Sequence, residues 1–129
     1  MQLARILVVD DEKDVRNNLS SILSRKINCE IKKAANGEDA LEELRKAKFD
    51  LVLLDIKLPG LSGIDVIKEA AKFTPETRIL AISAYDSYEI ADRALEAGAV
   101  DFLHKPITPE TIELKIKDIL TKIGKYWPK

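Results

Sequence analysis

The sequence predicts an α/β fold whose centre is a doubly wound sheet of five parallel strands. Short apolar segments alternate five times with amphipathic segments along the 129 residues, and such alternation is typical of right-handed β-α-β crossovers. Three of the apolar segments are continuous runs, which are expected of central strands covered on both faces. The length suits one domain with a single core.

The five expected strands differ in polarity, and this difference predicts their order. Residues 5–9, 51–54 and 79–82 are the continuous apolar runs, and residues 100–103 form the last strand. The segment CEIKKAA at residues 29–35 is more polar, so it should lie at an edge of the sheet. This placement fits the flavodoxin-like strand order 2-1-3-4-5.

The amphipathic segments have the periodicity and the boundary signals of helices. Apolar residues at spacings of three and four build one buried stripe on a helix. Asn36-Gly37 is a turn signal before the second helix, Gly98 should end the fourth, and Thr108-Pro109 should begin the fifth. The predicted stripes are Val15, Leu19, Ile22 and Leu23; Ala40, Leu41 and Leu44; Val66, Ile67, Ala70 and Ala71; Ile90, Ala94 and Leu95; and Ile112, Ile116, Ile119, Leu120 and Ile123.

The composition excludes several classes of protein. A net charge of −1 is not the basic footprint of a nucleic-acid-binding domain, so we expect no direct nucleic-acid contact by this chain. No apolar run approaches the about 18 residues of a membrane span, and the acidic start lacks the order of a signal peptide. The lone Cys29 can form no internal disulfide. We therefore expect a cytoplasmic protein.

Polar residues follow the central strands of the predicted sheet. In doubly wound sheets the functional crevice lies outside the carboxyl ends of the strands, at the switch point between strands 1 and 3. The residues at these ends are Asp10 and Asp11 after strand 1, Asp55 after strand 3, Ser83 after strand 4, and His104, Lys105 and Pro106 after strand 5.

These residue types together suit one kind of chemistry. Three converging carboxylates repel one another, and either protonation or a bound cation relieves the repulsion. Hard oxygen ligands suit Mg²⁺, while Ser83 and Lys105 would face an incoming anion. Transfer of a phosphoryl group to a carboxylate needs this combination, because the reaction is mostly positioning and charge neutralisation. Asp55 would then be the nucleophile.

Each of these residues also has an ordinary structural explanation when taken alone. Asp55 could cap a turn and Asp11 could cap the first helix. Ser83 could be a turn hydroxyl, and Lys105 could be a solvated surface charge. Their joint placement at neighbouring strand ends is much less easily explained in this way.

The motifs VVDDEKD, LVLLDIKLPGLSGID, ILAISAY and DFLHKP, in this order, resemble the receiver domain of bacterial two-component response regulators (CheY-like domains). The resemblance covers essentially the whole chain, with a receiver domain at residues 1–124 and a short C-terminal tail at 125–129. It implies a domain that promotes its own Mg²⁺-dependent phosphorylation and dephosphorylation and does not work as an ordinary enzyme. A sensor histidine kinase or a histidine phosphotransfer protein would supply the phosphoryl group.

The resemblance also assigns a role to each site residue. It implies that Asp55 is the phospho-acceptor and that Asp10, Asp11 and the backbone carbonyl of Lys57 bind Mg²⁺ together with Asp55. Ser83 and Phe102 would form the switch, and Lys105 would be the paired lysine. The bond before Pro106 would be cis, and Pro59 and Gly63 would shape the loop after the acceptor. The face of helix 4, strand 5 and helix 5 would bind a downstream protein or a second copy.

Two positions depart from the common pattern of the family. Lys57 stands two residues beyond Asp55, and Tyr85 stands two residues beyond Ser83. Both are bulky and neither is a carboxylate or an amide that could orient a water for hydrolysis. We therefore expect a long-lived phosphoryl group, suited to a relay or to transcription.

Two other functions deserve comparison with the receiver. A haloacid-dehalogenase-like phosphatase also forms an aspartyl-phosphate, but it should carry an acid where Lys57 stands. A flavodoxin-like nucleotide or flavin carrier should have a Ser/Thr/Gly-rich loop after strand 1, whereas DDEKD would repel a phosphate. Near the C-terminus, Trp127 could either pack back on the domain or contact a partner.

Overall fold

Five parallel strands in the order β2-β1-β3-β4-β5 form the centre of the molecule, as predicted. The computed structural model describes residues 2–84 and 88–129. The strands are β1 (Ala4–Val9), β2 (Cys29–Ala34), β3 (Leu51–Asp55), β4 (Arg78–Ser83) and β5 (Asp101–His104). The polar segment β2 is an edge strand, which confirms the placement inferred from its composition.

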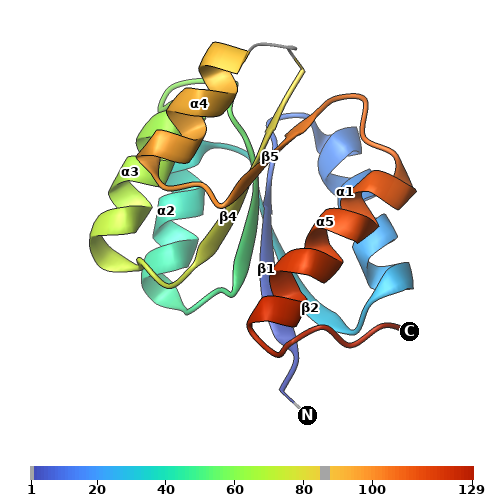
Figure 1. Ribbon diagram of the computed structural model, residues 1–129. Helices are drawn as coiled ribbons and strands as arrows, with labels where there is room; N and C mark the ends of the chain where they lie inside the picture. The colour runs from blue at the N-terminus through green and yellow to red at the C-terminus, as the bar shows by residue number, and fades with distance from the viewer. Residues whose placement is uncertain (1, 85–87) are drawn as a thin grey trace.

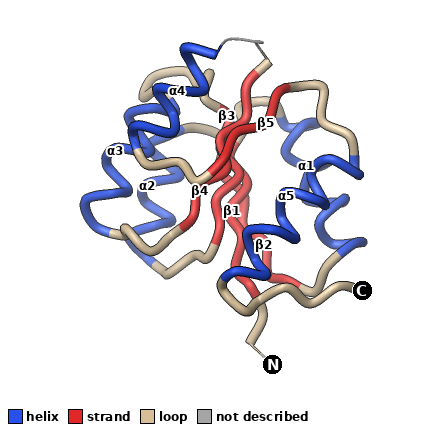
Figure 2. Tube along the Cα trace, in the orientation of Figure 1, coloured by secondary structure: helices blue, strands red, loops and turns tan. Residues whose placement is uncertain are grey.

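Five helices cover the two faces of this sheet (Figures 1 and 2). They are α1 (Lys13–Lys26), α2 (Gly37–Lys46), α3 (Gly63–Phe73), α4 (Tyr88–Ala97) and α5 (Pro109–Lys122). Helices α1 and α5 lie on one face, and α2, α3 and α4 lie on the other (Figure 1). Within residues 2–84 and 88–129, no helix combines the length and the apolar character needed to cross a membrane.

The sheet separates two layers of apolar packing, which explains the continuous apolar runs. Along β3, Leu51 and Leu53 belong to the layer under α1 and α5. Val52 and Leu54 belong to the layer under α2, α3 and α4. Successive residues of a strand point to opposite faces. All four side chains are fully buried because helices cover both faces. The central strands therefore carry polar residues only near or beyond their ends.

The helix starts follow the signals in the sequence. The Asn36 side chain accepts a hydrogen bond from the Asp39 amide at the start of α2, and Thr108 caps α5 through the Thr111 amide. Such caps satisfy amides that have no partner within the helix. Gly98 follows α4 with φ +129°, in the region that glycine adopts most easily.

Three apolar residues lie elsewhere than predicted. Ala71 is exposed, so its assignment to the buried stripe of α3 is wrong. Leu95 is 45% exposed, so its assignment to the buried stripe of α4 is wrong. The stripe runs instead through Ile90, Ala94 and Ala97, which pack on the core and leave Leu95 turned away from the sheet. Strand β5 begins at Asp101 and not at the predicted Val100. The Val100 side chain is exposed, although its amide donates a hydrogen bond to β4.

The C-terminal tail returns to the end of the sheet where the strands begin. Residues Ile27 and Pro128 form an antiparallel bridge, and the Asn28 amide donates to the Trp127 carbonyl oxygen at 2.7 Å. The indole N–H of Trp127 donates to the carbonyl oxygen of Gln2 at 3.1 Å. Trp127 therefore contacts its own domain, as one of its two interpretations predicted, and a contact with a partner stays a prediction. The domain boundary at residue 124 stays a prediction.

Candidate functional site

The three aspartates of the predicted site lie together. Asp10, Asp11 and Asp55 each offer a carboxylate oxygen, and these oxygens lie within 4.8 Å of one another. The convergence follows from the register of β1 and β3, which places Val9 beside Leu54 and so brings the next residues of both strands to the same edge. Asp10 and Asp55 are 1% and 5% exposed, whereas Asp11 faces solvent.

The two buried aspartates form the same kind of local turn. Asp10 Oδ1 accepts a hydrogen bond from the Glu12 amide at 2.9 Å, and Asp55 Oδ1 accepts one from the Lys57 amide at 3.0 Å. A side chain that binds the amide two residues later redirects the chain out of a strand. The turn-capping explanation for Asp55 is therefore correct as far as it goes, but it occupies only one of the two carboxylate oxygens.

Lys105 binds the remaining oxygens. Its Nζ lies 3.2 Å from Asp10 Oδ2 and 3.1 Å from Asp55 Oδ2. Lys105 is held in turn by β4, because its amide donates to the carbonyl oxygen of Ser83 at 2.7 Å. A cis peptide bond joins Lys105 to Pro106, as the resemblance implied. The ammonium group thus joins the ends of β1 and β3 to the segment after β5.

Burial and ion pairing have opposite effects on the pKa values of Asp55 and Lys105 in this cluster. Burial raises the pKa of the Asp55 carboxyl above its usual value, and this outweighs the Lys57 amide and Lys105, which lower it. Burial acts to lower the pKa of Lys105, but Asp55 and Asp10 more than offset it, so the pKa of Lys105 is raised. Lys105 is therefore charged at neutral pH and holds two carboxylates that would otherwise repel.

The predicted switch residues lie on β4 and β5. Ser83 ends β4 with 1% of its surface exposed and is aligned with His104 of β5. Phe102 is half-buried and packs on the core under α4. Its ring and the His104 ring form a T-shaped contact, with 4.7 Å between centroids. Tyr85, which was expected to affect the phosphoryl lifetime, lies outside the described residues.

A cavity of about 450 Å³ opens onto Asp55. Lys57 lines it, as expected, and so does Glu12, whose place beside the site sequence reasoning missed. Arg16 was also missed: its guanidinium donates to the carbonyl oxygen of Asp10 at 2.8 Å. Both residues look like ordinary charges at the start of a helix. The cavity is lined by Asp11, Glu12, Asp55, Lys57, Leu58, Pro59, Ala84 and Lys105.

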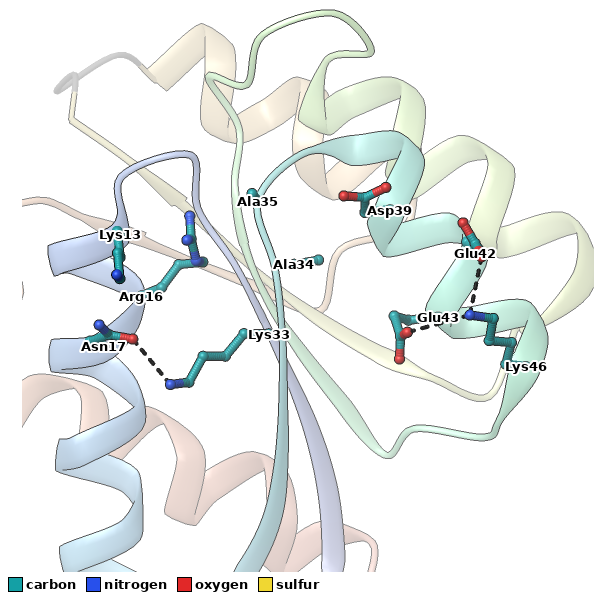
Figure 3. Close-up of a pocket in the computed structure, with 10 residues that line it drawn as sticks. All are labelled: Lys13, Arg16, Asn17, Lys33, Ala34, Ala35, Asp39, Glu42, Glu43 and Lys46. Carbon is teal, nitrogen blue, oxygen red and sulfur yellow. Dashed lines mark hydrogen bonds and ion pairs between the residues drawn. The ribbon is translucent and has the colours of Figure 1, made fainter.

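A second pocket, of about 400 Å³, lies between α1, the end of β2 and α2. Figure 3 shows its charged side chains pairing locally: Lys33 donates to Asn17, and Lys46 bridges Glu42 and Glu43. The first contact joins β2 to α1 and the second lies within α2, so they do not converge on one point. The pocket around Asp55 is therefore the better candidate for chemistry.

The residues around Asp55 suit a metal ion. Clustered carboxylate oxygens are the ligands of hard divalent cations, and the exposed Asp11 leaves one side of the cluster accessible to solvent. The donor set contains no nitrogen or sulfur from the described residues. The cluster could therefore hold a hard divalent cation, which oxygen ligands alone can bind.

Comparisons with known proteins agree with this fold. The family model of the response regulator receiver domain matches residues 6–117, so the chain belongs to the response regulator receiver domain family. Receiver domains are the signalling domains of two-component systems. This membership favours the receiver over the phosphatase and the flavin or nucleotide carrier.

Individual relatives show how far the similarity extends. The chain is 35% identical over 121 residues to the chemotaxis protein CheY of Thermotoga maritima, covering 94% of this chain and 98% of that protein. It is 40% identical over 107 residues to the response regulator protein PilR of Pseudomonas aeruginosa, covering 83% of this chain but only 24% of PilR. A CheY-like receiver domain from Methanospirillum hungatei has a similar structure, with a TM-score of 0.89, 32% identity and coverage of 96% and 98%.

Replacing Lys105 with Met should lower the free energy of unfolding by about 1–3 kcal/mol at neutral pH, because Asp10 and Asp55 lose their shared cation. We place the loss below that of a fully buried pair because the Lys105 side chain is 23% exposed. Asp55 already has a raised pKa when folded. Asp55 therefore takes up a proton in the folded state as the pH falls. The loss of unfolding free energy in the variant, which comes from the charged carboxylates, should shrink toward about pH 4.

Urea unfolding of wild type and variant from neutral to acidic pH would measure this deficit. Lys122→Met is a matched control, because Lys122 forms only an exposed pair with Asp118 among the contacts described. A deficit that stays constant with pH, or that Lys122→Met reproduces, would contradict the assigned role of Lys105.

Proposed function

We propose that this chain accepts a phosphoryl group on Asp55 from a sensor histidine kinase or a histidine phosphotransfer protein. The observation that supports this most strongly is the convergence of Asp10, Asp11 and Asp55 within 4.8 Å, with Lys105 3.1 Å from Asp55. Mg²⁺ would be held by these three carboxylates and by the backbone carbonyl of Lys57, and when bound it would neutralise charge on the phosphoryl oxygens. Cytoplasmic location stays a prediction.

The contacts of Asp55 prepare it to act as a nucleophile. A carboxylate oxygen of Asp55 forms the new O–P bond, while the N–P bond of a phosphohistidine breaks and the imidazole keeps the electron pair and takes up a proton. The Lys57 amide and Lys105 each hold one carboxylate oxygen, so the group is oriented before the donor arrives. Lys105 can then pair with the added negative charge.

We further propose that phosphorylation changes the face formed by α4, β5 and α5. Ser83 can approach the phosphoryl group, and Phe102 can turn into the space that the loop after β4 leaves. Among the described residues, α4 has only Ala94 fully buried, so few contacts oppose its movement. Tyr88 and Leu114 on this face are 79% and 69% exposed and could meet a downstream protein or a second copy.

The lifetime of the phosphoryl group depends on access of water. Lys57 lines the cavity and carries no group that would activate water at neutral pH, which supports a long lifetime. Glu12 lines the same cavity, so an acidic side chain is also present near Asp55. We propose that Lys57 and Tyr85 lengthen the lifetime, and that Glu12 is the residue best placed to shorten it.

Incubation with a small phosphodonor and Mg²⁺ should give one stable label on wild-type protein and none on Asp55→Asn. Asp11→Asn should retain labelling but lose most of its metal dependence, because Asp11 is the exposed ligand. Asp39→Asn, on the exposed start of α2, should label like wild type. Intact-protein mass spectrometry measures the label. Full single-site labelling of Asp55→Asn would show that the nucleophile is misassigned, and turnover of phosphate esters would favour a phosphatase.

Beryllofluoride with Mg²⁺ should shift backbone amide signals in α4 and at Phe102 as well as around Asp55. The change reaches these segments because Ser83 and Lys105 connect the site to β4 and β5. Heteronuclear NMR of the protein with and without beryllofluoride is the measurement. Shifts confined to the loop after Asp55 would rule out the proposed output face.

Lys57→Asn and Tyr85→Glu should each speed the loss of the label in Mg²⁺, because each supplies a group that can orient water. Glu12→Gln should slow it. Decay of purified phosphorylated protein measures all three rates, and the double variant of Lys57 and Tyr85 tests whether their effects add. Decay that is unchanged in every variant would mean that other residues determine the lifetime.

A further inference from the structure

We propose that Glu38 is a positioning residue for the 56–62 loop, the segment between the phospho-acceptor strand β3 and helix α3. Glu38 lies in the first turn of α2 and has no place in the expected site. The inference rests on the proposed function of Asp55, because its consequence for metal binding passes through the backbone of Lys57. It assigns a role to a side chain more than twenty residues away in sequence from the loop that it contacts.

The Glu38 carboxylate covers the backbone of the loop at Gly60 and Leu61. Its Oε1 accepts a hydrogen bond from the Leu61 amide at 3.0 Å. A Cβ atom built on Gly60 would lie 3.2 and 3.3 Å from Oε2 and Oε1. Gly60 has φ +72°, a conformation that side-chain-bearing residues rarely adopt. The loop therefore brings bare backbone against the carboxylate, and an amide bonded to a charged acceptor is held more strongly than one bonded to a neutral acceptor.

The start of α2 is itself fitted against this loop. Helices α2 and α3 lie side by side on one face of the sheet (Figures 1 and 2). A Cβ atom on Gly37 would lie 2.9 Å from the Leu61 carbonyl oxygen and 2.8 Å from Val66 Cγ2, so the helix start has no room to shift toward α3. A negative side chain in the first turn is also favoured by the helix dipole. Glu38 is therefore presented to the loop from a fixed element.

The other end of the loop is held by backbone contacts. The Gly63 amide donates to the carbonyl oxygen of Ile56 at 2.9 Å. A Cβ atom on Gly63 would lie 2.5 Å from Ile56 Cα, so the chain closes tightly here. The loop is thus held at its base by Gly63 and on its far side by Glu38. Between these points lies Lys57, whose amide binds Asp55 Oδ1 and whose carbonyl is the expected metal ligand.

Removing the Glu38 carboxylate should loosen the loop without disturbing the core, because the side chain is exposed. In Glu38→Ala, the amides of Leu61 and Lys57 should exchange faster with solvent. The affinity for Mg²⁺ alone should fall about 10-fold, the lower end of what residues outside the ligand set contribute to metal sites. Glu38→Gln keeps an oxygen acceptor and should restore both properties to within about twofold of wild type.

Hydrogen exchange by NMR and Mg²⁺ titration by calorimetry, both without a phosphodonor, test the proposal. The matched control is Glu42→Ala, one turn further along α2, where the carboxylate contacts Lys46 and not the loop. The role of Glu38 would be overturned if Glu38→Ala kept wild-type amide exchange at Leu61 and Lys57 and wild-type affinity for Mg²⁺. It would also be overturned if Glu42→Ala lost as much amide protection and Mg²⁺ affinity as Glu38→Ala. If wild-type protein binds no Mg²⁺, the proposed function fails, while the exchange of Leu61 and Lys57 still decides whether Glu38 restrains the loop.

Discussion

The structure of this site depends on one ammonium group shared between two buried carboxylates. Lys105 Nζ lies 3.2 Å from Asp10 and 3.1 Å from Asp55, so a single positive charge balances acids that come from two neighbouring strands. The sheet order makes this possible, because β1 and β3 are adjacent and the segment after β5 reaches across the end of β4. Without that charge, burying both carboxylates would be strongly unfavourable. The three clustered aspartates lie around it.

The central sheet and the acidic cluster could be predicted because their physical causes are local or topological. Continuous apolar runs mark strands buried on both faces, and the carboxyl ends of adjacent parallel strands must meet. The sequence could not show which way an apolar side chain turns at the margin of the sheet, and for this reason Leu95 was misplaced. Nor could it show that Glu12 and Arg16 face the site, because charges in a first helical turn usually face water.

The helices differ in how firmly they are held against the sheet, and α4 is held least firmly. Helices α1 and α5 each bury four residues, whereas α4 buries Ala94 alone among the residues described. The 56–62 loop lies between these extremes, because backbone contacts at Gly63 fix its base while the exposed Glu38 carboxylate holds its far side. The residues near Asp55 are held rigidly, whereas α4 is loosely packed. This combination allows a chemical change at one site to alter a distant surface.

The returning tail has a practical consequence for optical measurements. Trp127 is the sole tryptophan, and its indole N–H binds the carbonyl oxygen of Gln2, at the end of the sheet opposite the acidic cluster. Its fluorescence therefore reports on the junction between the two chain termini. Emission would change when the tail detaches or the domain unfolds, while events at the carboxyl ends of the strands would leave it largely unaffected. The chain thus contains an intrinsic fluorophore for folding that is well separated from its chemistry.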